Sequence, residues 1–256
     1  MTLHYVYVVW RRLSHEQGTN WGRFMLTFES RYVADEFYMA MATLRRSDGS
    51  PRFVTFSRAG AQLWTFDSNA EPQDPWWALM YVHLSGILKP FKERMIHTYL
   101  SDGNHSQRFD WPVIAIPAEG PDWVDGGAFF VRNKRQRTRY WFCAPDGSIH
   151  VSTTHQTKFR IRRAAGTSGQ ASTLAAGDLK QILIRKDMVT VQAIGSLFYV
   201  SIPASGRLAQ TAALVTWSFG RFFAGLGARW EADSAGVERL YVVGTNEDEG
   251  DEWELC

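Results

Sequence analysis

One pattern recurs in the second half of this chain, and its clearest copy begins Trp141-Phe142-Cys143-Ala144-Pro145-Asp146-Gly147. Ile149 and Val151 follow the turn, and the copy ends at Phe159-Arg160-Ile161. Proline sets the φ angle that a turn needs and glycine accepts a positive φ, so Pro145-Asp146-Gly147 predicts a tight turn. The stretch therefore predicts a strand-turn-strand unit that an aromatic residue closes.

Two more copies follow. The second runs from Phe198-Tyr199-Val200-Ser201-Ile202-Pro203, through Gly206 and Leu208, to Trp217-Ser218-Phe219. The third runs from Trp230 through Gly236 and Leu240-Tyr241-Val242-Val243 to Trp253-Glu254-Leu255. The opening and closing aromatic residues are 18, 19 and 23 positions apart in the three copies. Three copies of one unit predict a three-fold internal repeat.

This pattern resembles the β-trefoil superfamily, in which three four-stranded units pack around a pseudo-three-fold axis. The resemblance covers residues 126–256, and is closer to the fascin-like and agglutinin-type trefoils than to the ricin type. Ricin-type repeats end in Gln, any residue, Trp, whereas Thr157, Val215 and Asp251 stand at the Gln positions here. The resemblance implies a core position for each closing aromatic residue: Phe159, Trp217 and Trp253. A solenoid and a β-sandwich remain alternatives.

The first half has a different pattern, so we expect an α+β domain at residues 1–118 and a β-trefoil-like, all-β domain at residues 119–256. The linker composition of residues 117–122 suggests this boundary. Residues 5–10 and 24–28 are rich in strand-forming residues. Val33, Phe37 and Met41 fall on one helical stripe, with Ser30 as the N-cap.

Further elements of the first half are less strongly patterned. Residues 53–56 and 63–66 predict a hairpin around Ala59-Gly60. A helical stretch is expected from Trp76, interrupted at Lys89-Pro90 and resuming to Leu100, and a buried strand at residues 113–116. In the second half, residues 164–177 predict a surface insertion.

Composition narrows the class of protein. Hydrophobic residues make up 45% and charged residues 21% of the 256 residues, which indicates a globular domain and no membrane partner. The 11 Trp favour large aromatic cores, and a net charge of +2 argues against a surface built wholly for nucleic acid. Two cysteines encode no disulfide framework, which favours a cytoplasmic location. No heptad pattern indicates a particular oligomer.

The resemblance implies a lectin-like protein that binds glycans or a small molecule at shallow loop sites. Aromatic rings stack on the C–H faces of sugars, and carboxylates accept hydrogen bonds from hydroxyl groups. The candidate ligand-binding residues lie near the predicted turns or at the entry to the repeat: Trp123, Asp146, His150, Arg207 and Trp230.

A basic run in the first hairpin is a candidate anion contact, because guanidinium groups pair with oxyanions. Its members are Arg132, Lys134, Arg135, Arg137 and Arg139. A closed trefoil would place this hairpin beside the acidic C-terminal copy, so charge compensation between the two is an equal alternative.

An enzyme is the second hypothesis, with acid–base chemistry in the first half or in a pocket between the two halves. The candidate catalytic residues are His83, His97, Asp102 and His105. Their spacing matches no zinc pattern, so we predict no metal, and Gly225-Leu226-Gly227 lacks a dinucleotide-binding context, so we predict no cofactor. A protein-binding or protease-inhibitor module with residues 164–177 as its loop is the third hypothesis.

Overall fold

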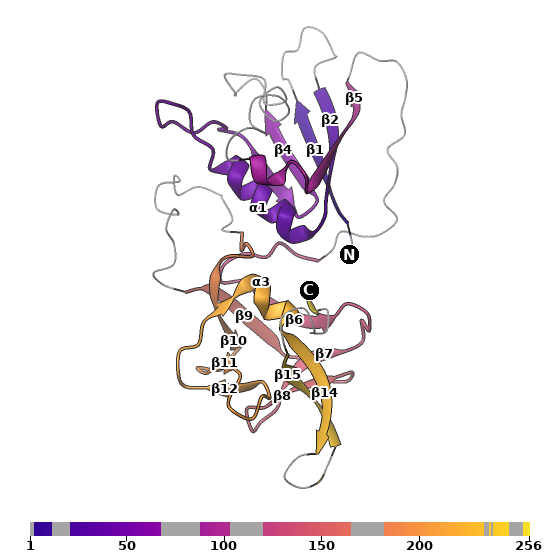
Figure 1. Cartoon of the computed structure of the whole chain (residues 1–256), viewed down its shortest axis with the longest axis vertical. Helices are drawn as coiled ribbons and strands as arrows, with labels where there is room; N and C mark the ends of the chain where they lie inside the picture. Colours follow the sequence, from indigo (N-terminus) through magenta and orange to yellow (C-terminus); the bar gives the residue numbers. More distant parts are fainter. Residues whose placement is uncertain are drawn as a thin grey trace. The chain divides into compact units, whose positions relative to one another are not determined.

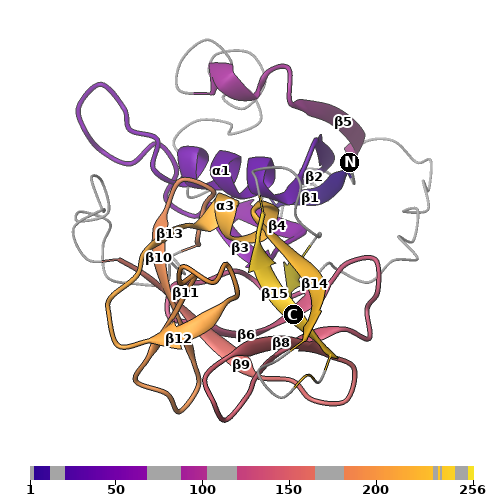
Figure 2. The ribbon, with the colours of Figure 1, turned by 60° about the horizontal axis from the view of Figure 1, so that its bottom comes forward.

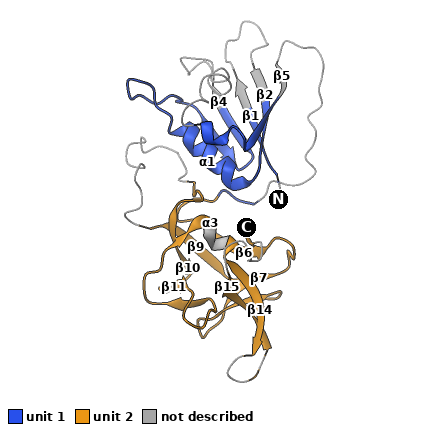
Figure 3. Ribbon diagram, viewed as in Figure 1, with its two compact units in different colours: residues 1–122 blue, residues 123–256 orange. Residues whose placement is uncertain are grey.

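The computed structural model (Figure 1, and turned in Figure 2) describes residues 3–11, 21–67, 88–102, 120–164, 182–232, 236, 238–245 and 253–256. The chain divides into two compact units, residues 1–122 (unit 1) and residues 123–256 (unit 2), coloured separately in Figure 3. The expected strand at residues 113–116, most of the expected helix from Trp76 and most of the expected insertion at residues 164–177 lie outside the described residues.

The described residues of unit 1 contain the α-helix α1 and a five-stranded sheet in the order β3-β4-β1-β2-β5. β1 pairs parallel with β4, whereas β1–β2, β2–β5 and β3–β4 are antiparallel. Its elements are β1 (His4–Arg11), β2 (Trp21–Phe28), α1 (Arg31–Ala42), β3 (Ser57–Gly60), β4 (Leu63–Asp67), the short 3-10 helix η2 (Lys89–Phe91) and β5 (Met95–Asp102).

The helix α1 packs on the sheet through the stripe that the sequence predicts. Ser30 caps it, since the Ser30 hydroxyl accepts a hydrogen bond from the Val33 amide at 3.4 Å. Phe37 stacks on Trp64 of β4 with ring centroids 6.3 Å apart, and meets Phe28 of β2 at 5.4 Å. The predicted strands at residues 5–10 and 24–28 and the predicted helix are therefore confirmed.

Two predictions for unit 1 are wrong. The first hairpin strand is β3 at residues 57–60, not 53–56, because Phe53 and Phe56 are both buried and Phe56 packs on Trp64 instead of alternating along a strand. The stretch up to Leu100 is not helical, because Met95–Asp102 pairs with β2 along its whole length. In both places tertiary contacts override a weak local pattern.

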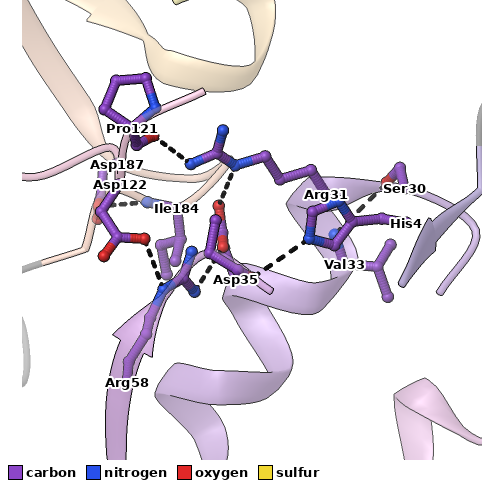
Figure 4. A network of polar contacts seen from close by, with 11 residues as sticks. His4, Ser30, Arg31, Val33, Asp35, Arg58, Pro121, Asp122, Ile184 and Asp187 are labelled. Carbon is purple, nitrogen blue, oxygen red and sulfur yellow. Dashed lines mark hydrogen bonds and ion pairs between the residues drawn. The ribbon is translucent and has the colours of Figure 1, made fainter. Parts of the chain in front are cut away.

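Buried charges join the helix, the sheet and the end of unit 1 (Figure 4). Arg58 on β3 pairs with Asp35 of α1 at 2.7 Å and with Asp122 at 2.9 Å. Arg31 donates a hydrogen bond to the Pro121 carbonyl at 2.7 Å. Burial alone would lower the pKa of Arg58, but the two carboxylates outweigh that effect and raise it. Each charged group of this network therefore faces an opposite charge within unit 1, since Arg31 also lies 3.6 Å from Asp35.

In its described residues, unit 2 is all-β apart from one short helix. Its first four strands are β6 (Ala128–Asn133), β7 (Tyr140–Cys143), β8 (Ile149–Ser152) and β9 (Lys158–Arg163). The next four are β10 (Met188–Ala193), β11 (Tyr199–Ser201), β12 (Ala209–Thr211) and β13 (Trp217–Ser218), followed by α3 (Phe219–Ala224). The last are β14 (Leu226–Ala232), β15 (Glu238–Gly244) and β16 (Trp253–Leu255).

The strands of unit 2 form one curled sheet, visible in Figure 2. β6 pairs with β9, β10 pairs with β13, and the last strand, β16, returns to pair with β6. Three buried residues connect the copies, since the Ile149 amide donates to the Leu208 carbonyl and the Leu208 amide donates to the Val242 carbonyl, at 2.9 and 2.7 Å.

Aromatic rings fill the centre of this sheet. Trp141 is fully buried and meets Phe159 and Trp253 edge-on, with ring centroids 5.8 and 5.5 Å apart. Phe159 and Trp253 lie in the core as predicted, whereas Trp217 is half-buried. Within the described part of the chain, no helix has the length and apolar character needed to cross a membrane.

Candidate functional site

Unit 2 carries an open hollow of about 350 Å³, within the range of about 300–1,000 Å³ typical of ligand pockets. Its apolar wall is formed by Trp230, Phe142, Val151 and Leu240. Its polar lining consists of Arg139, Arg239, His150, Ser152 and Thr153. The hollow thus combines an apolar surface with several hydrogen-bond donors.

Neighbouring strands in the order β7-β8-β15-β14 position these side chains (Figure 2). Trp230 on β14 lies directly opposite Leu240 on β15, and His150 on β8 lies opposite Tyr241 on β15. Residues directly opposite on antiparallel strands share a face, so the indole ring is held beside the hollow by the sheet itself. Trp230 is 63% exposed and lies on β14, the last strand in the sheet order, which pairs with β15.

A short chain of hydrogen bonds fixes His150. The Asp146 carboxylate lies 2.5 Å from the Ser148 hydroxyl, which lies 2.6 Å from Nε2 of His150. The hydrogen bonds from the Ser148 side chain and amide lower the pKa of Asp146, with smaller effects from His150 and Arg239, so its carboxylate is ionised at neutral pH. An ionised carboxylate only accepts hydrogen bonds, so Ser148 donates to Asp146 and His150 Nε2 donates to Ser148.

This direction of donation has a chemical consequence. A serine nucleophile must give its proton to the histidine, whereas the Ser148 proton points at Asp146. The arrangement orients the imidazole of His150, which is only 6% exposed, as a fixed part of the lining. In this arrangement Ser148 is not activated as a nucleophile by His150.

A second set of contacts joins His150 to residues that do not line the hollow. The His150 ring meets the ring of Tyr241 with centroids 4.5 Å apart. The Arg207 guanidinium lies over the same Tyr241 ring, 4.3 Å from its centroid. Arg207 Nε donates to the Glu231 carboxylate at 2.5 Å. Arg207 therefore supports Tyr241 and, through it, the position of His150.

The basic run of the first hairpin divides into three parts. Arg132 donates two hydrogen bonds to Glu254, at 2.8 and 2.5 Å, which matches the charge compensation expected between the first hairpin and the C-terminal copy. Arg139 lines the hollow. Lys134, Arg135 and Arg137 are exposed in the turn between β6 and β7.

Four of the five residues predicted to bind ligand gather at this place. His150 and Trp230 line the hollow. Asp146 is linked to His150 through Ser148, and Arg207 contacts Tyr241, on which His150 packs. Trp123 does not belong to it, because this ring is 5% exposed and packs edge-on against Phe219 at 5.5 Å. Trp123 is therefore a core residue rather than a stacking platform.

The residues predicted for catalysis do not form a described site. His97 lies on β5 beside Phe24, and burial lowers its pKa to about 4, so its imidazole is neutral at neutral pH. Asp102 ends β5, and His83 and His105 lie outside the described residues. No three His, Cys, Asp or Glu side chains in the described part of the chain come together to hold a metal ion.

Several residues of the hollow were not among the sequence candidates, notably Arg239 and Phe142. Arg239 had only a partial signal, because a hairpin around Gly236 brings the start of β15 next to the end of β14, where Arg239 lies opposite Glu231 rather than Trp230. Phe142 stands in the clearest copy of the repeat, but its sequence does not say which face of β7 borders a hollow.

Comparison with known proteins adds no assignment. No protein-family model matches this chain, and the search of curated proteins found none similar to it.

Proposed function

We propose that unit 2 is a β-trefoil-like, lectin-type domain that binds carbohydrate in the hollow beside Trp230. The observation that carries the proposal is a largely exposed indole ring held rigidly at the rim of a hollow with fixed polar groups. An exposed tryptophan offers an apolar face to the C–H groups of a sugar, and the side chains of Ser152, Thr153 and His150 offer partners for its hydroxyl groups.

The strand pairing supports the trefoil part of this proposal. If each of the first two copies is extended backwards to include β6 or β10, β6–β9 and β10–β13 are corresponding pairs, and β16–β6 joins the last copy to the first. Ile149, Leu208 and Val242 occupy matching places in the three copies and are joined by backbone hydrogen bonds. A trefoil axis requires such contacts among three equivalent strands.

A cytoplasmic location remains part of the proposal. Cys143 and Cys256 are unpaired, and burial raises the pKa of both thiols, which keeps them protonated and poorly reactive. Such thiols suit a reducing compartment.

A glycan array with the full chain tests the proposal, with Trp230→Ala as the informative variant. We expect selective glycan binding by the parent protein and a loss of at least roughly tenfold in affinity when the indole is removed, because buried aromatic contacts dominate small interfaces.

Phe198→Ala is the matched control. Phe198 opens the second copy as Trp230 opens the third, is 48% exposed, and does not line the hollow. This variant should bind as the parent does. A folded parent protein that binds no glycan overturns the proposal, and so does glycan binding that survives Trp230→Ala unchanged.

A further inference from the structure

Four large apolar side chains of unit 2, here called the apolar tip, are exposed in two neighbouring loops. Leu197 is 88% exposed, Phe198 48% and Ile194 45%, all in the turn between β10 and β11. Leu214, 66% exposed, lies in the loop between β12 and β13. Both loops leave the same end of the β11–β12 ladder, because the first residue of β11 pairs with the last residue of β12. Single exposed apolar side chains need no explanation, but four at one end of a sheet do.

The backbone of the first loop is hydrogen-bonded within the sheet and the turn. The Ser196 amide donates to the Ala193 carbonyl at 3.0 Å, and the Phe198 amide donates to the Ser196 hydroxyl at 3.1 Å. The Ile194 amide donates to the Lys158 carbonyl on β9 at 2.9 Å. Unpartnered backbone groups are costly in an apolar medium, so a loop with these bonds already made can present its side chains to lipid.

Exposed cations of β9 lie beside the apolar tip. Lys158, Arg160 and Arg162 alternate with buried residues, so they share the outer face of the sheet. The hydrogen bond from Ile194 to Lys158 places the tip at the end where β9 begins. Within the described ranges, none of the three basic side chains forms an ion pair, and Lys158 lies over the ring of Phe130, 5.1 Å from its centroid.

Carboxylates are scarce on this side of unit 2. The strands β6, β9, β10, β11 and β12 contain no Asp or Glu, and neither do the two loops of the apolar tip. Glu254 on β16 is paired with Arg132 of β6. At the opposite end of β9 from the tip, Asp187 pairs with the Arg163 side chain and Asp125 accepts a hydrogen bond from the Arg163 amide. The cations nearest the tip therefore have no carboxylate paired with them.

We propose that the apolar tip, together with Lys158 and Arg160, docks unit 2 onto an anionic lipid bilayer. The four apolar side chains enter the interface and the two cations contact the head groups. Stable contact with a membrane surface needs two signals, and apolar burial with attraction to anionic lipid supplies both. Nucleic acid fits this surface less well, because bases stack on aromatic rings and three of the four tip side chains are aliphatic. The average composition that argued against a membrane partner does not register four side chains gathered in one place.

Co-sedimentation of the full chain with lipid vesicles tests this inference. The probes are vesicles of phosphatidylcholine alone and vesicles of phosphatidylcholine mixed with phosphatidylserine. We expect the anionic vesicles to bind at least roughly tenfold more tightly, and this preference to shrink at high ionic strength because salt screens the cations.

Variants separate the two signals. Leu197→Thr and Leu214→Thr should each weaken binding to the anionic vesicles by roughly tenfold, because each removes an apolar side chain from the interface. Lys158→Gln and Arg160→Gln should each weaken it by roughly fivefold, because each removes one cation from the head groups.

Ile96→Thr and Lys92→Gln are the matched controls. Ile96 is 65% exposed, almost as Leu214 is, and Lys92 is an exposed cation, and both belong to unit 1. Each control should change vesicle binding by less than about twofold, since membrane attraction falls off within a Debye length. Circular dichroism checks that every variant is folded.

The outcomes are distinct. Equal binding to the two kinds of vesicle, or binding to neither, overturns the inference when the protein is folded. Anionic binding that survives both leucine variants also overturns it, because charge alone would then explain the binding. If a single-stranded oligonucleotide displaces the vesicles and binds both leucine variants as tightly as the parent, the cations belong to a nucleic-acid surface instead. None of these results touches the carbohydrate proposal, because no residue of the apolar tip or of β9 lines the hollow.

Discussion

The chain contains two Asp-Gly-Ser turns, Asp48-Gly49-Ser50 in unit 1 and Asp146-Gly147-Ser148 in unit 2. In both, one carboxylate oxygen accepts hydrogen bonds from the serine amide, at 2.9 Å, and from the serine hydroxyl, at 2.6 Å in unit 1 and 2.5 Å in unit 2. The central glycine has a φ of 82° in the first turn and 84° in the second. Locally the two turns are the same structure.

The two turns differ in the further contact that the serine hydroxyl makes. Ser148 continues to His150 Nε2 at 2.6 Å, and His150 packs on Tyr241 at the hollow, whereas Ser50 lies in an exposed turn. Three identical residues therefore make the same turn, and only the strand that follows makes one of them part of a candidate site. Local sequence determines the turn, and tertiary context determines its use.

The largest expected effect is shared by both turns. Gly49→Ala and Gly147→Ala should each destabilise their unit by roughly 1–2 kcal/mol, because a side chain is strained at positive φ. An added Cβ has open space at Gly49, and at Gly147 meets only Gln210 at 3.7 Å, so the strain should be similar. Urea unfolding combined with hydrogen exchange in each unit measures it.

Gly60→Ala is the control for both, since Gly60 has no positive φ and no atom within 4 Å of the added Cβ. It should change stability by less than about 0.5 kcal/mol. A loss at Gly147 much larger than that at Gly49 would show that the two turns are not equivalent even locally.

Ser148→Ala and Ser50→Ala should separate the turns. Ser148→Ala removes a hydrogen bond to a buried imidazole as well as one to a carboxylate, so we expect a loss of about 1 kcal/mol in the stability of unit 2. Ser50→Ala should cost less than about 0.5 kcal/mol, because the bond that it removes is exposed.

Thermal unfolding with His150 observed by NMR provides the measurement. The His150 resonances should shift in Ser148→Ala and stay unchanged in Ser50→Ala. Equal losses of stability in the two variants, with unchanged His150 resonances, would contradict the assigned role of Ser148.

The same contrast explains how far the sequence predicts this molecule. The turn at Asp146-Gly147 and the helix capped by Ser30 follow from local patterns that tertiary contacts reinforce. The core positions of Phe159 and Trp253 were expected from the trefoil resemblance, which was wrong for the half-buried Trp217. β5 was mispredicted because its strand form depends on pairing with β2, about seventy residues earlier in the chain, which no local pattern encodes.

The candidate site shows the same limit. Trp123 and Trp230 are alike in sequence, both near turns, yet one is buried against Phe219 and the other stands exposed at the hollow. Arg139 is one of five basic residues in its run. It lines the hollow and Arg137 does not, because Arg139 directly precedes β7 whereas Arg137 lies within the turn. Exposure and convergence depend on strand register, which composition does not determine.

The smallest expected effect concerns pH. The pKa of Asp146 is below its usual value of 3.8, chiefly because of its hydrogen bonds from Ser148, so the folded form binds this proton less readily than the unfolded form. The resulting stabilisation is complete above pH 3.8 and is lost as the pH falls through the folded pKa. Asp146→Asn removes it, so this variant should be less stable than the parent at neutral pH, by less than about 1 kcal/mol because solvent screens the site.

Urea unfolding between neutral pH and the acid limit of the folded state tests this expectation. The stability difference between the parent and Asp146→Asn should shrink as the pH falls below 3.8. A difference that stays constant into acid would mean that the charge of Asp146 does not stabilise the turn. Because the pKa of Asp48 is also lowered by its serine, Asp48→Asn should follow the same direction. Only Asp146→Asn should also disturb His150, since only that carboxylate fixes which atom donates in the Ser148–His150 hydrogen bond.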